Sequence, residues 1–394
     1  VSGLYDVYGG NADTAIRAAT QVPANDPFTI VPVMACATDN LCFGVTGSVA
    51  TRPPYEFARL ASSLDHLTKG RLGWNIVTGY LDSEARGSGK KSKEKHDTRY
   101  DIAHEYMEIV YRLWEESWDD DAVVQDRDAG VFTDPAKVHR IDHDGTYFRV
   151  SGIHICEPSP QRTPVLFQAG TSSKGRAFAG QHAECVFIAG NSAEAMAGSV
   201  KALREEAVER GRKQDDLKIF GLITVIVAET DDKARDKFAE YQKYGLIEGS
   251  LAVLSGWTGI DLSQVDPNCV LEDIESDAIQ SALRLSGART LREWAQDITV
   301  GGTGEVLVGS PESVADQLIE WFEISGIDGF NLAYTVMPES IEDFVDMVVP
   351  VLQRRGVFKH EYTAGTFREK LFGKSARLSA PHVGASYRRQ TAIT

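Results

Sequence analysis

Alternation between strand-length apolar runs and helical segments is the feature that most constrains the fold of this chain. Runs such as LCFGVTGSV (41–49) and RLGWNIVTGY (71–80) are continuously apolar, and each precedes a segment of helical period. Continuous apolar strands are typical of a parallel sheet that helices cover on both faces. The pattern therefore predicts an α/β domain, either an open doubly wound sheet or a (β/α)₈ barrel.

Six strand–helix units of this kind follow one another, whereas a closed barrel needs eight. Helices are expected over 55–67 and over 100–114, where apolar residues recur at spacings of three and four. The other four strands are expected at residues 163–170, 184–190, 217–229 and 328–334.

Two longer stretches interrupt this rhythm and are interpreted as insertions. The first, 115–162, contains an expected hairpin at HRIDHDGTYFRVSG (139–152), and the second, 245–310, is rich in Gly, Ser and Asp. Long insertions at one end of a barrel commonly form lids or site walls. We expect one domain over 1–355 and a basic C-terminal tail over 356–394 that wraps the barrel's own surface or another subunit.

Charge and composition narrow the classes of partner. A formal net charge of −16 offers no basic patch for nucleic acid or for an anionic membrane. The five cysteines are scattered and lack metal-ligand spacing, which favours a reducing cytoplasm and no metal site. No apolar run is long enough to span a bilayer, and no leader pattern is present. We expect a cytoplasmic protein that binds a small molecule.

The stretch FQAGTSSKG (167–175) joins an expected strand to an expected helix. Gly170, Thr171, Ser172 and Ser173 offer backbone N–H groups and hydroxyls at the positive end of that helix. Such an end binds anions such as phosphate. The alternative is that Ser172 or Ser173 only caps the helix.

A second strand end, NIVTGY, carries Asn75, Thr78 and Tyr80 where barrel active sites are built, although these residues could also be plain strand caps. In EKHDTRY (94–100), His96 and Asp97 lack a third ligand at helical spacing, so no metal site is expected. Arg99 and Tyr100 at this helix start could reach a phosphate, or the helix could simply be capped and salt-bridged at its surface.

Long blocks of the sequence resemble one known family. These are ARLASSLDHLTKGRLGWNIVT, HDTRYDIAHEYMEIVYRLWEESW, CEPSPQRTPVLFQAG and FVDMVVPVLQRRG. They are similar to bacterial-luciferase-like, two-component flavin monooxygenases, in the branch that acts on nitrilotriacetate, dibenzothiophene sulfone, dimethyl sulfide and long-chain alkanes. The resemblance runs from about Tyr5 into the tail. It implies a (β/α)₈ TIM barrel whose first two strands are absent from this sequence.

The resemblance also implies a chemistry. Enzymes of this family receive reduced FMN from a separate NAD(P)H:flavin reductase and react it with O₂ to form a C4a-(hydro)peroxyflavin. This species would oxygenate a small apolar substrate, with organosulfur compounds as candidates. A homodimer or homotetramer is expected. Two alternatives stay open: a non-catalytic flavin-binding barrel protein and an F420-dependent oxidoreductase.

Cofactor-binding residues follow from the same resemblance. Ser172 and Tyr100 match phosphate-binding positions, and Ala169, Gly170 and Ser173 adjoin them. Asn75 and Thr78 match residues that line the isoalloxazine ring.

The candidate catalytic residues are Tyr5, Gln21 and Tyr80. Tyr5 and Gln21 match positions at the flavin and substrate face, and Tyr80 stands where alkane-oxidising relatives carry a histidine. A phenol of pKa near 10 is a poor substitute for imidazole near neutral pH, which weakens the alkane interpretation. Trp257 is expected to line an apolar pocket or, alternatively, to be ordinary core.

Overall fold

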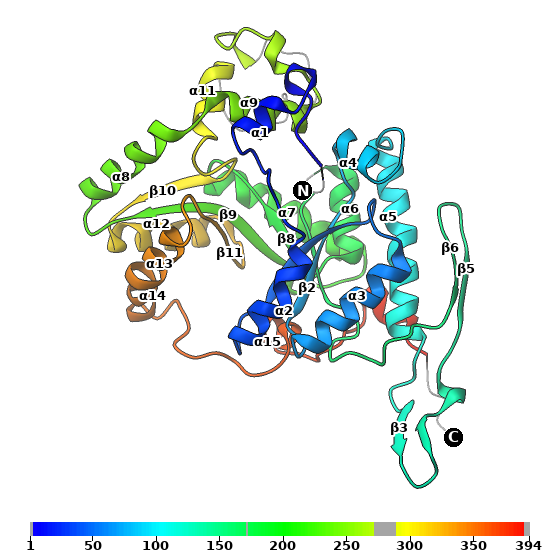
Figure 1. Cartoon of the computed structure of the whole chain (residues 1–394). Coiled ribbons are helices and arrows are strands. Elements are labelled where there is room, and N and C mark those ends of the chain that lie inside the picture. Colours follow the sequence, from blue (N-terminus) through cyan, green and yellow to red (C-terminus); the bar gives the residue numbers. More distant parts are fainter. Residues whose placement is uncertain (1–2, 171, 272–288, 390–394) are drawn as a thin grey trace.

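The computed structural model describes residues 3–170, 172–271 and 289–389. Its centre is a parallel sheet in the order β1-β2-β7-β8-β9-β10, with β11 also paired to β9 (Figure 1). The strands are β1 (Phe43–Ser48), β2 (Leu72–Val77), β7 (Val165–Gln168), β8 (Cys185–Ile188), β9 (Lys218–Val227), β10 (Glu305–Gly309) and β11 (Gly329–Ala333).

All six predicted strands are confirmed, but the sheet holds a seventh. Strand β10 lies at the end of the stretch 245–310, so these last residues belong to the main sheet and not to an insertion. Strand β8 pairs with residues 218–221 of β9, and β10 pairs with residues 223–227. Strand β11 pairs with residues 220–224, which overlap both of these ranges, so it must lie along the opposite edge of β9. Among the described strands β1 pairs only with β2, so the TIM-barrel-like sheet is open between β1 and β11.

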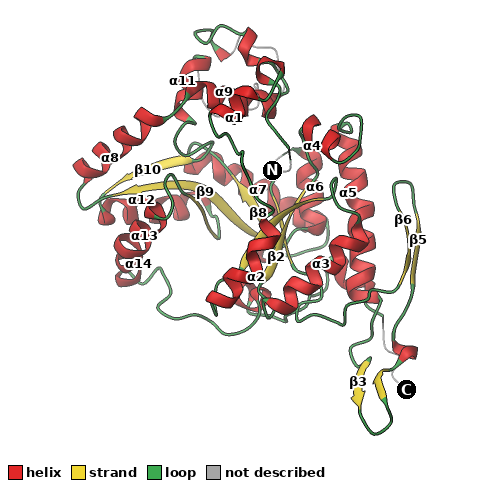
Figure 2. Ribbon diagram, in the orientation of Figure 1, coloured by secondary structure: helices red, strands yellow, loops and turns green. Residues whose placement is uncertain are grey.

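Helices surround this sheet, as Figure 2 shows. Helix α3 has proline at its first position, which suits a helix start, and α5 carries Asp97 in its first turn near the positive end of the helix dipole. The main helices are α2 (Pro27–Ala37), α3 (Pro54–Leu67), α4 (Asp82–Gly87), α5 (His96–Tyr111), α6 (Ser173–His182), α7 (Ala193–Glu209), α8 (Asp231–Tyr244), α9 (Ile247–Thr258), α12 (Pro311–Ser325) and α14 (Val349–Arg354). The other α-helices of the described residues are α1 (Asp13–Arg17), α11 (Leu291–Asp297), α13 (Glu339–Asp343) and α15 (Phe367–Phe372).

An aromatic core joins β2 to these helices. The ring of Trp74 lies 4.3 Å from that of Phe57 in α3 and 6.3 Å from that of Trp114, which follows α5 in a π-helical turn (Arg112–Glu116). All three rings are buried, so they hold α3 and α5 against the sheet. In the described ranges, no helix has the length and apolar character that a bilayer crossing requires.

Two hairpins project beside the body of the molecule (Figure 1). The pair β5 (Ile141–Asp144) and β6 (Arg149–Gly152) confirms the hairpin predicted at 139–152, whereas β3 (Val123–Asp126) and β4 (Val131–Thr133) form one that was not predicted. The Glu105 carboxylate in α5 accepts hydrogen bonds from the backbone N–H groups of residues 146–148, which fastens the β5–β6 turn to α5.

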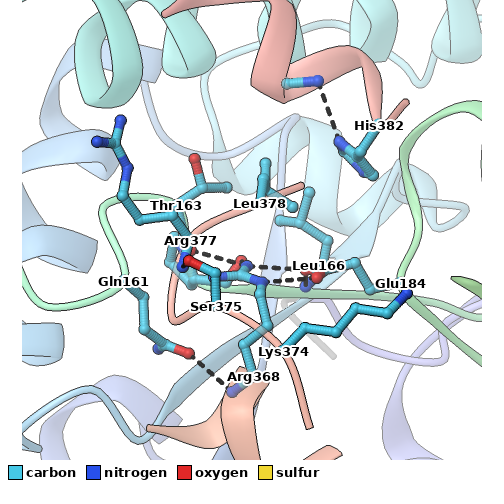
Figure 3. A network of polar contacts seen from close by, with 12 residues as sticks. Gln161, Thr163, Leu166, Glu184, Arg368, Lys374, Ser375, Arg377, Leu378 and His382 are labelled. Atoms are coloured by element: carbon cyan, nitrogen blue, oxygen red, sulfur yellow. Dashed lines mark hydrogen bonds and ion pairs between the residues drawn. The ribbon is translucent and has the colours of Figure 1, made fainter. Parts of the chain in front are cut away.

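The tail packs back on the sheet through buried charges, shown in Figure 3. Arg368 in α15 donates to both carboxylate oxygens of Glu184, at 2.6 and 2.8 Å. Glu115 accepts from Arg377 at 2.7 Å and from Arg388 at 2.9 Å. The tail therefore covers the barrel's own surface, which was one of the two expectations; the other was that it wraps another subunit. The domain boundary at residue 355 stays a prediction.

Candidate active site

The carboxyl ends of β2 and β7 bring the two polar motifs together. In the sheet register Asn75 lies opposite Phe167 and Ile76 lies opposite Gln168. Ala169, Gly170 and Ser172 follow β7 directly and lead into α6, which begins at Ser173. Because both strands are parallel, the motifs NIVTGY and FQAGTSS end at the same edge of the sheet.

Ser172 is the N-cap of α6. Its Oγ accepts the Gly175 N–H at 3.0 Å, so the capping interpretation is confirmed. The capping bond leaves other backbone N–H groups of the first turn directed outward, where an anion can bind. Ser173 is the first, exposed residue of the helix, and Thr171 lies outside the described residues.

Tyr100 covers this helix start. A Cβ at Gly170 would lie 3.0 Å from the Tyr100 hydroxyl, and a Cβ at Gly175 would lie 2.9 Å from it. Only residues without side chains leave room for the phenol at these two positions. Burial raises the pKa of Tyr100 despite a hydrogen bond from Ser172 that lowers it, so the hydroxyl stays a neutral donor.

Together with Ser172 and Tyr100, His96 forms a group at the start of α6 that we call the cradle, although from the sequence His96 was considered only as a metal ligand. It lies one turn before Tyr100 on α5, and its Nε2 is 3.4 Å from the Ser172 Oγ. Its Nδ1 lies 2.9 Å from Asp97. The spacing of four residues between His96 and Tyr100 was the available signal, since it places both on one face of a helix. Arg99 instead lines a separate cavity of about 30 Å³ with Thr78 and Glu84.

Two buried acceptors at the strand ends have no hydrogen-bond partner among the described residues. Asn75 donates from Nδ2 to Thr46 Oγ1 at 3.0 Å, while its Oδ1 has no donor. The Oε1 of Gln168 is likewise without a donor. A buried acceptor left unpaired costs about 1–3 kcal/mol, so a ligand that donates here is favoured. Neither Thr46 nor Gln168 was predicted, although each interrupts an apolar strand.

The three candidate catalytic residues meet at a second point of the site. The hydroxyls of Tyr5 and Tyr80 lie 2.6 Å apart, and the Tyr5 hydroxyl donates to Gln21 Oε1 at 3.3 Å. Burial raises the pKa of both phenols, although Trp257 in α9 lowers each of them through a hydrogen bond. Both tyrosines therefore remain neutral at physiological pH.

A hollow of about 360 Å³ adjoins Gln21. Its walls include Leu4 from the N-terminal segment, Phe28 from α2 and Thr46 from β1. This volume suits a small-molecule ligand. Within the described ranges, no three His, Cys, Asp or Glu side chains are grouped as metal ligands.

Comparison with known proteins places this geometry in context. The family model for luciferase-like monooxygenases matches residues 11–329. The chain is 47% identical to dimethyl-sulfide monooxygenase of Hyphomicrobium sulfonivorans, over 98% of this chain and 82% of that protein. It is 46% identical to long-chain alkane monooxygenase of Geobacillus thermodenitrificans, over 98% of this chain and 86% of that one.

Solved structures agree with the sequence relatives. A crystal structure of DmoA from Hyphomicrobium sulfonivorans superposes with a TM-score of 0.93 at 48% identity, covering 98% of this chain and 84% of that one. A riboflavin lyase solved with modified FMN and riboflavin superposes with a TM-score of 0.91 at 39% identity, covering 99% and 88%. The chain belongs to the luciferase-like monooxygenase family.

Proposed function

We propose that this chain is the oxygenating component of a two-component flavin monooxygenase. It binds reduced FMN from a separate NAD(P)H:flavin reductase and uses O₂ to oxygenate a small apolar substrate, with organosulfur compounds as first candidates. The relatives named above support the reaction class. The observation that carries the proposal is the cradle at the start of α6.

The cradle suits the phosphate of FMN. Backbone N–H groups at the N-terminus of α6 and the Ser172 hydroxyl supply donors, and the neutral Tyr100 hydroxyl lies above two bare glycines. The His96 Nε2, 3.4 Å from the Ser172 Oγ, would lie beside a phosphate bound at this serine.

The ring of the cofactor would lie toward Asn75. Its unpaired Oδ1 fits the ring N–H groups of an isoalloxazine, which would satisfy an acceptor that protein donors leave free. When bound there, reduced FMN supplies the electrons that activate O₂. A ring in this position would also lie beside Thr46, which orients the Asn75 amide.

The tyrosine pair would hold a proton beside the reacting atoms. Because Gln21 Oε1 accepts from Tyr5, the Tyr5 oxygen is left to accept from Tyr80. In this order each phenol is a hydrogen-bond donor, and because Trp257 also bonds to Tyr80, one lone pair of Tyr80 is left for a ligand donor. Leu81 and the partly buried Val253 pack around Tyr5, which excludes water from this side of the site.

Anaerobic titration with photoreduced FMN tests the cradle. Ser172→Ala and Ser192→Ala form a matched pair, because each serine caps a helix by accepting one backbone N–H. Both variants should lose about 1 kcal/mol of stability, but only Ser172→Ala should weaken FMN binding, and Tyr100→Phe should weaken it too. Equal FMN affinity in all variants would contradict the placement.

A turnover assay distinguishes the proposed monooxygenase from the two alternatives, a non-catalytic flavin-binding protein and an F420-dependent oxidoreductase. With a flavin reductase, NADH and dimethyl sulfide as the probe substrate, oxygen uptake should accompany an oxygenated product. Flavin retention without product from any apolar sulfide or alkane tested would favour the non-catalytic flavin-binding interpretation. Preference for reduced F420 over reduced FMN would favour the oxidoreductase interpretation.

A further inference from the structure

Helix α9 touches the N-terminal segment at a point where it has no side chain. A Cβ at Gly256 would lie 2.3 Å from Cδ1 and 2.7 Å from Cε1 of the Tyr5 ring, and 3.3 Å from Cδ2 of Leu81. Carbon atoms in proteins do not approach to 2.3 Å without a bond, so any residue other than glycine must displace the ring or the helix.

The Tyr5 ring has little freedom to move away. It is 1% exposed and packs among Ala15, Leu81 and Tyr80. Its hydroxyl is hydrogen-bonded to both Tyr80 and Gln21. A shift of the ring by even 1 Å would lengthen the 2.6 Å contact beyond hydrogen-bonding geometry.

The same face of α9 also lacks a side chain at Gly249, two turns earlier. A Cβ at Gly249 would lie 3.1 Å from Cβ of Ala18 and 3.2 Å from Oγ1 of Thr20. Residues seven apart share one face of a helix, so Gly249 and Gly256 together allow α9 to approach the whole segment that carries Tyr5 and Gln21. The closest of these approaches is at Tyr5.

We propose that Gly256 is a positioning residue of the active site: its missing side chain seats the Tyr5 ring against α9 so that the Tyr5 hydroxyl pairs with Tyr80. The inference deepens the proposed function, on which its catalytic consequence depends. Gly256 acts through Tyr5, the residue that it contacts most closely. It is separate from the phosphate cradle, which α5 and α6 provide.

Urea unfolding tests the packing. Gly198 in α7 is the matched control, because a Cβ there would meet nothing within 4 Å. Alanine favours helices over glycine, so Gly198→Ala should raise the urea midpoint, whereas Gly256→Ala should lower it. If Gly256→Ala does not fold, adding Tyr5→Ala, which removes the obstructing ring, should restore folding. A raised midpoint for Gly256→Ala, or no rescue by Tyr5→Ala, would overturn the proposal.

A mutant cycle tests the positioning without any turnover. Tyr5→Phe and Tyr80→Phe each remove one hydroxyl of the pair, so in the native background their effects on the urea midpoint should be non-additive. In the Gly256→Ala background the effects should become additive, because the pair is already broken. The same non-additivity in both backgrounds would refute the positioning role.

The catalytic consequence is measured last. Gly256→Ala should bind photoreduced FMN as tightly as the native chain, yet turn over dimethyl sulfide at least tenfold more slowly, as Tyr5→Phe should. The double variant should be no slower than either single one. If the native chain turns over nothing, the proposed function fails while the mutant cycle still decides whether Gly256 positions Tyr5.

Discussion

Replacing Arg368 by methionine should destabilise the protein by about 3–5 kcal/mol. The Arg368 and Glu184 side chains are 3% and 7% exposed, and they form a paired contact at 2.6 and 2.8 Å. Burial alone raises the pKa of Glu184, but the Arg368 guanidinium outweighs it and holds this pKa below its usual value. Arg368→Met leaves that carboxylate buried and uncompensated, which is the costly way to break such a pair.

The free energy of unfolding from urea titration, followed by circular dichroism and by tryptophan fluorescence, measures the effect. Arg149→Met is the control, because Arg149 pairs with Asp144 on the surface and should change stability by less than about 1 kcal/mol. Adding Glu184→Gln to Arg368→Met should recover part of the loss, since the amide still accepts the Leu166 N–H without a charge. A loss below about 1 kcal/mol for Arg368→Met would refute the reasoning.

Three further predictions concern the cradle, the tail and the tyrosine pair. Gly170→Ala should weaken FMN binding in a folded protein, measured by anaerobic titration, because its Cβ would lie 3.0 Å from the Tyr100 hydroxyl and 2.3 Å from Gln168 Nε2, so both side chains must shift; unchanged affinity would contradict this. Burial lowers the pKa of His382 to about 4, from about 6.5 unfolded, so the folded state binds this proton less tightly. The contribution of neutral His382 to the free energy of unfolding is therefore fully present above pH 6.5 and is lost as the pH falls toward 4, with a loss of about 2 kcal/mol at pH 5. His382→Asn, which removes this titration and the hydrogen bond to the His182 carbonyl, should make unfolding free energies at pH 7 and pH 5 more alike, and an unchanged difference would contradict this. Tyr80→Phe should slow turnover by about 10²-fold without changing the affinity for FMN, and a change in affinity alone would argue against its role.

Local patterns predicted much of this fold. Continuous apolar runs located the six strands, and spacings of three and four located α5, because strand and helix periodicity depend on residues near one another in sequence. The cradle was predicted for the same reason: a strand end, small residues and hydroxyls before a helix lie within nine consecutive residues.

The missed elements lack such a signal. Strand β10, EVLVG, is only five residues long and lies at the end of a Gly-rich stretch, so its partner β9 decides its conformation. The β3–β4 hairpin is short and mostly exposed, which leaves little apolar pattern to detect.

The sequence by itself therefore determined the fold class and the family, and it predicted a site at the end of β7. Tertiary structure alone decided that Tyr5 meets Tyr80, 75 residues away, and that Arg368 meets Glu184, 184 residues away. It also decided that residue 256 in α9 has no room for a side chain, because the Tyr5 ring packs against it. A periodic pattern records which residues are buried, but the partner of a buried group depends on how distant segments close around it.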